Sequence, residues 1–257
     1  MIPMKRVFVL LVLTVVAASC GKDKDVPSAK AVFMSKWNWV YGADGSKNGS
    51  ETYAFDAGHK IVSSIFYNIE TTPAGAVNYT YTSNAAGRIT KAQHNNGYRT
   101  FEYNASGQVL KASFFNASGT LTRYYLYNYT ADGYEQVSYA AAGVAGSKKV
   151  FQYTADKKNI ASRTVYNSAG TKTEETVFTF LTTRSPENIY PYSEMMKIEQ
   201  GFANQHAVEV ASTSVSGTSY TTRHTYTYNA EGYPLTDKET YSTGAAPSNM
   251  TYEYILK

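Results

Sequence analysis

Histidine is the residue type best suited to acid–base or metal chemistry in this chain, and its four copies are scattered. They are His59, His94, His206 and His224, and no two of them have the spacing of a metal motif such as H-x-x-x-H. We therefore predict no metal site and no cofactor. His224 lies in a segment where aromatic residues alternate with threonine, so we expect it to be a packing residue rather than a catalyst.

The carboxylates also lack the arrangement of a catalytic pair. Glu174 and Glu175 are neighbours on a predicted strand and point to opposite faces. Asp56, Asp132 and Asp156 fall in predicted turns, where they satisfy backbone groups. The sequence has no G-x-S-x-G elbow, phosphate-binding loop or calcium loop. We predict a non-catalytic protein; the alternative is a hydrolase-like enzyme whose site is assembled from distant strands.

Aromatic side chains are the better candidates for binding a ligand. Trp37 and Trp39 are the only tryptophans, and both would project from one face of a strand. Their flat rings suit a glycan or an extended peptide; the alternative is that they close the core at the first strand. Tyr190 and Tyr192 are the next binding candidates, with ordinary capping contacts as the alternative.

The N-terminal residues predict export and a lipid anchor. Residues 1–19 have a basic start, an apolar run and small residues before Cys20, the only cysteine. This pattern is typical of a secretory signal peptide and is too short for a membrane span. The stretch AASC resembles the lipobox of bacterial lipoproteins, which implies that Cys20 carries lipid and attaches the chain to a membrane. The alternative is an ordinary signal peptide that ends near a cysteine.

The residues after the cysteine predict location. Residues 20–30 are small, charged or proline, which suits a flexible tether. The run KDKD resembles the export signal of Bacteroidetes surface lipoproteins, so we predict a surface-exposed position on the outer membrane; the alternative is a hydrophilic spacer in a periplasm-facing protein. Removing Lys5 and Arg6 with the leader leaves 22 of 24 basic residues against 20 acidic ones. This near-neutral balance predicts no nucleic-acid partner.

One tetrapeptide, Asn-Ala-Ser-Gly, occurs at 104–107 and again at 116–119. Asn and Ser satisfy turn backbone with their side chains, and Gly enters the left-handed region without steric cost, so each copy predicts a hairpin loop. The interval leaves room for one strand between the loops. Similar turn sequences, in which an aromatic residue is followed by Asn, Asp, Ala or Ser and usually Gly, recur along the chain. Their recurrence predicts an up-and-down antiparallel meander.

Period-two alternation predicts all-β structure with an aromatic face. Along 220–228, tyrosines and His224 share one face while threonines and Arg223 share the other. Tyr is unusually common, at 24 residues. We predict about 14 to 16 strands in one domain, 31–257. A sheet of that size must curl, so we expect a closed or strongly curled barrel with a Tyr-rich inner face, or two packed sheets.

One segment, 185–205, interrupts the repeated pattern of strands and turns. It is too long for a hairpin turn, and its apolar and polar residues do not alternate. Ser193 could cap a short helix there. Segments of this length usually cover something, so we expect this one to seal one end of the barrel or to act as a ligand lid.

Three hairpin motifs, YTYNAEGYPL, FEYNASGQVL and YTSNAAGRI, resemble those of uncharacterised Bacteroidetes surface lipoproteins. The resemblance covers roughly residue 52 to the C-terminus and implies a porin-like antiparallel domain of hairpins that are distantly similar to YD repeats. It implies no catalytic residues. The repeats here carry mostly Tyr-Asn or Tyr-Thr before the turn, which departs from true YD repeats.

These observations together predict a non-catalytic binding or structural accessory module. An outer-membrane channel is a further alternative, since alternation and strand number both suit it. Arg223, Lys148, Lys172 and Glu174 would then crowd the predicted lipid-facing surface, where charges are costly. The chain also ends in Lys257 rather than in a terminal aromatic residue.

Overall fold

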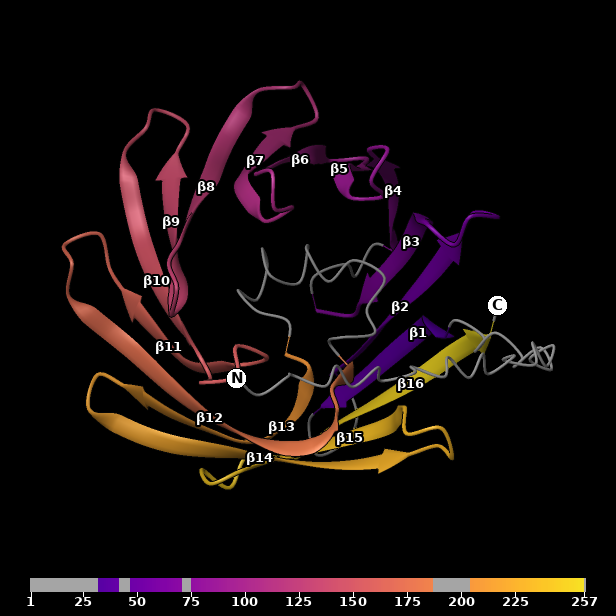
Figure 1. Ribbon diagram of the computed structural model, residues 1–257, viewed down its shortest axis with the longest axis vertical. Helices are drawn as coiled ribbons and strands as arrows, with labels where there is room; N and C mark the ends of the chain where they lie inside the picture. The colour runs from indigo at the N-terminus through magenta and orange to yellow at the C-terminus, as the bar shows by residue number, and fades with distance from the viewer. Residues whose placement is uncertain (1–31, 42–46, 71–74, 187–203, 257) are drawn as a thin grey trace, which may run out of the picture. The chain divides into compact units, whose positions relative to one another are not determined.

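A computed structural model describes residues 32–41, 47–70, 75–186 and 204–256. Sixteen antiparallel strands are found there, each paired with its sequence neighbours, and β1 pairs with β16 to close a barrel (Figure 1). This confirms the predicted all-β meander and selects the closed barrel over two packed sheets. Among these described residues, no helix is long and apolar enough to cross a membrane.

The strands follow one another in chain order around the barrel. Their bounds are β1 (Val32–Tyr41), β2 (Lys47–Phe55), β3 (Ile61–Asn68), β4 (Val77–Ser83), β5 (Ile89–His94), β6 (Gly97–Tyr103), β7 (Val109–Asn116), β8 (Leu121–Tyr129), β9 (Gly133–Ala140), β10 (Ala145–Tyr153), β11 (Ile160–Tyr166), β12 (Lys172–Arg184), β13 (His206–Val215), β14 (Thr218–Tyr228), β15 (Pro234–Tyr241) and β16 (Ser248–Leu256).

The repeated tetrapeptide forms the turns that were predicted for it. In the first copy, Asn104 Oδ1 accepts a hydrogen bond from the Gln108 backbone N–H at 2.9 Å, and the Asn104 carbonyl accepts one from Gly107 N–H at 2.9 Å. Gly107 has φ 81°, a value that a side chain would strain. The same asparagine-led bonding recurs at four other hairpins, whose asparagines are Asn84, Asn116, Asn167 and Asn229.

The core lies on the inner face and is rich in tyrosine, as the alternation predicts. Along β8, Tyr127 is 6% exposed and packs in the core, whereas its neighbour Asn128 is exposed. The buried members of the core are Met34, Tyr53, Ile61, Ile89, Ala92, Phe101, Val109, Ala112, Tyr127, Tyr134, Phe151, Ile160 and Tyr252. The interior therefore carries phenol hydroxyls as well as hydrocarbon.

Inner tyrosines need hydrogen-bond partners, and the backbone supplies several. Tyr103 donates to the Ile89 carbonyl at 2.5 Å, and Tyr254 donates to the Pro234 carbonyl at 2.6 Å. The Tyr127 hydroxyl accepts from the side-chain amide of the buried Gln136 at 2.8 Å. These bonds tie neighbouring strands together through side chains as well as through the backbone.

The C-terminal end of the 185–205 segment is attached to the start of β11, and the two ends of the segment bond to each other. Asn204 is fully buried, and its Oδ1 accepts from the Ile160 N–H at 2.8 Å. His206 N–H donates to Asn159 Oδ1 at 2.9 Å, and Ser185 N–H donates to the Gln205 carbonyl at 3.0 Å. Ser193 and the predicted sealing or lid role fall on residues outside the described ranges.

Burial raises the pKa of several inner tyrosines, among them Tyr81, Tyr127, Tyr129 and Tyr254. The unfolded chain ionises these phenols near pH 10, and the barrel does so at higher pH. Their contribution to stability is therefore complete below pH 10 and is lost as the pH rises through the folded-state values.

We expect the free energy of unfolding to fall above pH 10, by about 1.4 kcal/mol per pH unit for each tyrosine ionised only in the unfolded chain. Absorbance at 295 nm should report fewer phenolates at pH 11 in the native protein than in denaturant. Identical titration curves for the native and denatured protein would contradict this prediction.

Candidate functional site

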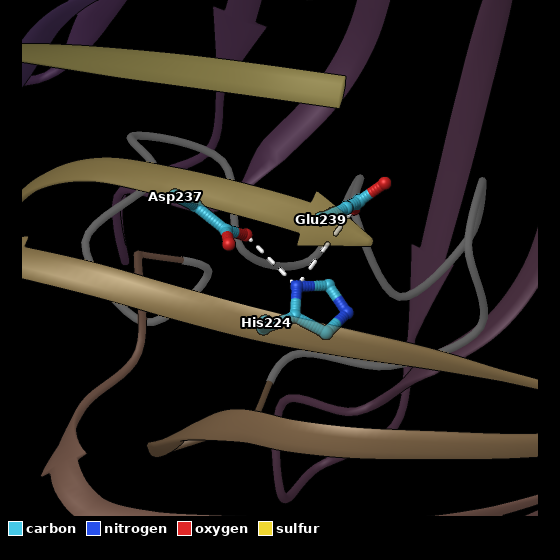
Figure 2. A group of neighbouring side chains, drawn as sticks. All are labelled: His224, Asp237 and Glu239. Carbon is cyan, nitrogen blue, oxygen red and sulfur yellow. Dashed lines mark hydrogen bonds and ion pairs between the residues drawn. The ribbon is translucent and has the colours of Figure 1, made fainter. Parts of the chain in front are cut away.

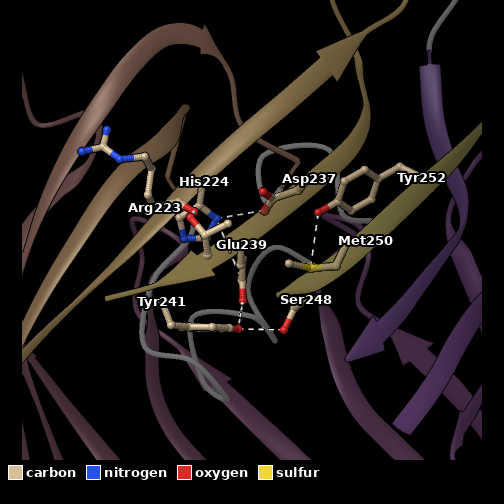
Figure 3. A network of polar contacts seen from close by, with 9 residues as sticks. Arg223, His224, Asp237, Glu239, Tyr241, Ser248, Met250 and Tyr252 are labelled. Atoms are coloured by element: carbon tan, nitrogen blue, oxygen red, sulfur yellow. Dashed lines mark hydrogen bonds and ion pairs between the residues drawn. The ribbon is translucent and has the colours of Figure 1, made fainter. Parts of the chain in front are cut away.

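A network of polar side chains crosses the inner face of β14, β15 and β16 (Figure 3). The β14–β15 register places His224 opposite Glu239 and Tyr226 opposite Asp237. Period-two alternation puts Asp237, Glu239 and Tyr241 on the same face of β15. The hairpin thus brings one imidazole and two carboxylates together, although they are 13 and 15 residues apart in sequence.

The imidazole of His224 faces both carboxylates through one nitrogen. Nδ1 lies 3.0 Å from Asp237 Oδ2 and 3.8 Å from Glu239 Oε1 (Figure 2). The side chains of His224, Asp237 and Glu239 are 14%, 4% and 21% exposed. A carboxylate oxygen only accepts hydrogen bonds, so Nδ1 donates in the short contact with Asp237.

Asp237 is the most buried charge of this group. The residue is 3% exposed, and its Oδ1 is buried without a hydrogen-bond partner. The neighbouring cation, Arg223, points away from His224 (Figure 3) and lies 4.0 Å from Glu209. Burying an ionised carboxylate costs several kcal/mol unless it is paired. In the part of the chain that is described, His224 supplies that pairing.

Glu239 is held in place by hydroxyl groups. Tyr241 donates to Glu239 Oε2 at 2.6 Å, and the Tyr241 and Ser248 hydroxyls lie 2.7 Å apart. Burial, together with the adjacent Glu239 carboxylate, raises the pKa of Tyr241 to about 12. Tyr241 therefore stays a hydrogen-bond donor throughout the physiological pH range and fixes the orientation of Glu239.

The two tryptophans predicted to bind ligand lie on the adjoining strand. Across β16, Trp39 pairs with Met250, which in turn pairs with Asp237 on β15. The Trp37 and Trp39 rings are 4.3 Å apart between centroids, with an interplanar angle of 35°. Trp39 is only 6% exposed, and its Nε1 donates to the Tyr41 hydroxyl at 3.2 Å.

Gly49 on β2 makes room for the buried indole. A Cβ at this position would come within 2.0 Å of Trp39 Cζ2 and within 2.6 Å of the Tyr67 carbonyl oxygen. The indole therefore lies directly over the β2 backbone. This packing accounts for the burial of Trp39, and the ligand-binding roles of Trp37 and Trp39 stay predictions.

Glu51 adds a third carboxylate to the same wall. It is 7% exposed and accepts hydrogen bonds from Trp37 Nε1 at 3.4 Å, Tyr53 hydroxyl at 3.1 Å and Ser64 hydroxyl at 2.8 Å. Hydrogen bonds to the charged form stabilise a buried carboxylate. We call the five-strand inner surface formed by β14, β15, β16, β1 and β2 the acidic wall.

The strands across the barrel, β6 to β8, carry arginine instead (Figure 1). The Arg99 guanidinium lies 5.3 Å from the centroid of the Phe114 ring, and Arg123 lies 4.6 Å from the same centroid. Arg99 is opposite the fully buried Ala92 in the ladder, which places it on the inner face. The inner face therefore has a basic side opposite the acidic wall.

The remaining sequence-predicted residues are dispersed. His206 contacts Asn159, and His59 packs against Phe33. His94 lies 5.1 Å from the Tyr79 ring, and burial lowers its pKa. Cys20, Tyr190 and Tyr192 lie outside the described residues.

The carboxylates excluded as a catalytic pair behave as predicted. Glu174 bonds Arg163 while its neighbour Glu175 bonds Lys172, so the two point to opposite faces. Among the predicted turn aspartates, Asp56 Oδ1 accepts from the Lys60 N–H at 2.9 Å.

Asp237 and Glu239 are the functional candidates that sequence reasoning missed. A search for linear histidine motifs cannot find them, because the contact depends on the register of a hairpin. The sequence feature that could have indicated the cluster is the D-x-E pair of Asp237 and Glu239, which share one face of a strand. The turn at Asn229 brings this strand back alongside His224.

Chemically, this cluster can hold a proton or a cation. Nucleophilic catalysis would also need a hydroxyl beside the imidazole, and the Ser248 hydroxyl of this network instead bonds Tyr241.

The fold is similar to that of two solved porin-like proteins. One, from Bacteroides uniformis, is 12% identical with a TM-score of 0.59, and the match covers 87% of this chain and 98% of that chain. The other, from Bacteroides vulgatus, is 11% identical with a TM-score of 0.57, covering 88% and 99%. No family model and no curated protein matches the chain. At this identity the likeness confirms the predicted porin-like fold; lipoprotein status and kinship with YD repeats stay predictions.

The packing of Trp39 predicts a specific cost for Gly49→Ala. The added methyl group meets the indole and a backbone oxygen, so Trp39 must move and the free energy of unfolding should fall by about 1–3 kcal/mol. Tryptophan emission should shift to longer wavelength in the folded variant. Gly58→Ala is the matched control, because its nearest atom would be the Asp56 carboxylate at 3.4 Å. Equal stability of the two variants would refute this account of the wall.

Proposed function

We propose that this chain is a lipid-anchored protein of the cell envelope, exposed on the cell surface, whose barrel is a non-catalytic binding module for a glycan or a peptide. The observation that carries the proposal is the acidic wall, where the Trp37 and Trp39 rings lie side by side, 4.3 Å apart, next to the Glu51 carboxylate. Rings beside hydrogen-bond acceptors suit ligands that combine flat apolar faces with donor groups.

The envelope location is supported by the leader and by the fold. Residues 1–19 are typical of a signal peptide, and Cys20 follows small residues as in a lipobox. The charged KDKD run supports surface exposure. The two similar structures are described as porin-like and come from Bacteroides, which fits an envelope protein.

The outer wall argues for an anchored barrel rather than a spanning one. Glu102 and Lys111 pair across β6 and β7, one step along the ladder from the buried pair of Phe101 and Ala112, so side-chain alternation turns their ion pair of 3.8 Å away from the core. Lys148 and Glu135 form a second outward pair at 3.1 Å, on β10 and β9. Charges are costly on a lipid-facing surface near the bilayer centre.

The proposed ligands, glycans and peptides, suit the hydrogen-bonding groups on the acidic wall and on the opposite, arginine-bearing side of the inner face. Saccharide hydroxyls and peptide N–H groups can donate to carboxylates on the acidic wall. The opposite side offers guanidinium groups, Arg99 and Arg123, which donate only. A ligand with both donors and acceptors could therefore bond to both sides of the inner face.

Ligand binding should depend on the Trp37 ring. In a screen of glycans and peptides, Trp37→Ala should weaken binding of any ligand found by about tenfold or more, because the ligand can no longer stack on this aromatic ring. Trp37→Phe keeps a ring and should retain most of the affinity. Titration calorimetry measures both.

The matched control is Tyr124→Ala, which removes an outward ring stacked on Tyr139 at 4.9 Å. This variant should bind as the unaltered protein does. A screen without any ligand, or binding that is insensitive to Trp37→Ala, would contradict the proposed binding role.

The lipid anchor predicts a sharp change in partitioning. In a detergent phase separation, the unaltered protein should enter the detergent-rich phase, and Cys20→Ser freed of residues 1–19 should enter the aqueous phase, because several acyl chains contribute about 0.8 kcal/mol per buried methylene. Immunoblotting of the two phases measures the result. If Cys20→Ser without the leader remained in the detergent-rich phase, the barrel itself would hold the protein in the membrane and the anchored module would be excluded.

A further inference from the structure

We propose that His224, Asp237 and Glu239 form a binding site for a divalent transition-metal ion of the zinc type. These side chains offer one ligand atom each, all within 4.8 Å of one another. The sequence alone predicts no metal site, because the three residues form no linear motif. The β14–β15 register creates the cluster.

The distances suit a small ion. A metal with bonds of about 2.0–2.1 Å and tetrahedral angles keeps its ligand atoms about 3.3 Å apart. The two contacts of His224 Nδ1, 3.0 Å to Asp237 Oδ2 and 3.8 Å to Glu239 Oε1, lie on either side of that value. Figure 2 shows both carboxylates directed at the same nitrogen. Each of these two separations differs from about 3.3 Å by half an ångström or less, and the third, between the carboxylate oxygens, is within 4.8 Å.

A second observation is independent of these distances. Asp237 is 3% exposed, and its Oδ1 is buried without a hydrogen-bond partner. A buried carboxylate oxygen is normally satisfied, so an orphaned one beside two other ligand groups indicates a missing positive partner. A divalent ion bound by both oxygens of Asp237 would supply it.

The charge balance favours a dication. Two carboxylates and a neutral imidazole carry a net charge of −2, and a protonated imidazole still leaves −1. Arg223, next in sequence, is 61% exposed and lies near Glu209. A dication neutralises both carboxylates at once, which a single proton on His224 does not.

Neighbouring groups orient the ligands as outer-shell partners do in metal sites. Tyr241 donates to Glu239 Oε2 at 2.6 Å, which leaves Oε1 directed at the cluster. The Tyr226 ring lies parallel to the imidazole, at 9° and 6.0 Å between centroids. Such partners set the affinity of a site by fixing ligand direction.

The donor set selects the class of metal. An imidazole nitrogen suits zinc and its neighbours in the first transition row, whereas calcium and magnesium prefer sites made entirely of oxygen. One nitrogen and two carboxylate oxygens therefore favour Zn²⁺ over Ca²⁺ and Mg²⁺. Three protein ligands also leave a position for water or for a ligand group.

Zinc titration of the full chain, purified in detergent without a polyhistidine tag, tests the site. Calorimetry should show one Zn²⁺ per chain, and Co²⁺ should give visible absorption bands of a low-symmetry site. Ca²⁺ and Mg²⁺ should bind at least 100-fold more weakly. Zinc should also raise the midpoint of thermal unfolding.

Four variants assign the binding to these residues. Asp237→Asn and His224→Asn should each raise the dissociation constant at least 100-fold, and Glu239→Gln provides a third ligand change if either variant fails to fold. Tyr241→Phe, which removes an outer-shell hydrogen bond, should raise it about tenfold. His59→Asn is the matched control: it removes an exposed imidazole in a turn, and asparagine tolerates its φ of 65°.

The zinc-binding results decide between presence and absence of the proposed site. Zinc binding lost in the cluster variants and kept in His59→Asn supports the site. Absence of stoichiometric zinc binding, or binding unaffected by the folded cluster variants, overturns it. Binding of Ca²⁺ as tight as that of Zn²⁺ overturns the assignment to a transition metal.

Discussion

Closure of the barrel by β1 and β16 is the contact on which the rest of the structure depends. Eight residue pairs join these strands, from Val32 with Leu256 to Val40 with Asn249. Without it, both strands would expose unpaired backbone groups at a sheet edge. The same pairing sets Trp37 beside Tyr252 and Trp39 beside Met250, so it also assembles the acidic wall from the two ends of the chain.

Closure imposes a second constraint, because alternate side chains must then fill one enclosed face. This chain fills much of that face with tyrosine rather than leucine or isoleucine, and each buried hydroxyl needs a partner. Backbone carbonyls, Gln136 and Glu51 provide several. Tyr134 is 4% exposed and its hydroxyl has no partner in the described residues. An aromatic inner face therefore brings polar chemistry into the core, and charged groups such as Glu51 can be held there by hydrogen bonds.

The fold was predictable from local patterns, whereas the site was not. Asn104 and Gly107 specify their turn through their own side-chain and backbone properties, and alternation at 220–228 assigns faces without knowledge of partners. Closure depends on strand number and register around the whole sheet, which alternation does not encode. The His224 cluster depends on the register of a single hairpin, where a shift at Thr227/Tyr228 accompanies the pairing. A slip of one residue would send Asp237 and Glu239 to the other face.

The burial of Asp237 links the stability of the barrel to the proposed metal site. An apolar residue at this position would satisfy the packing of β15 against β16 without the cost of desolvating a charge. The chain instead retains a carboxylate with one unpartnered oxygen and places His224 and the oriented Glu239 beside it. Local departures from the rules of good packing concentrate where a protein meets its ligands. The acidic wall contains such a departure at Asp237, whose ladder partner Met250 also pairs with Trp39, so the proposed metal site and the proposed ligand-binding rings share one part of the inner face.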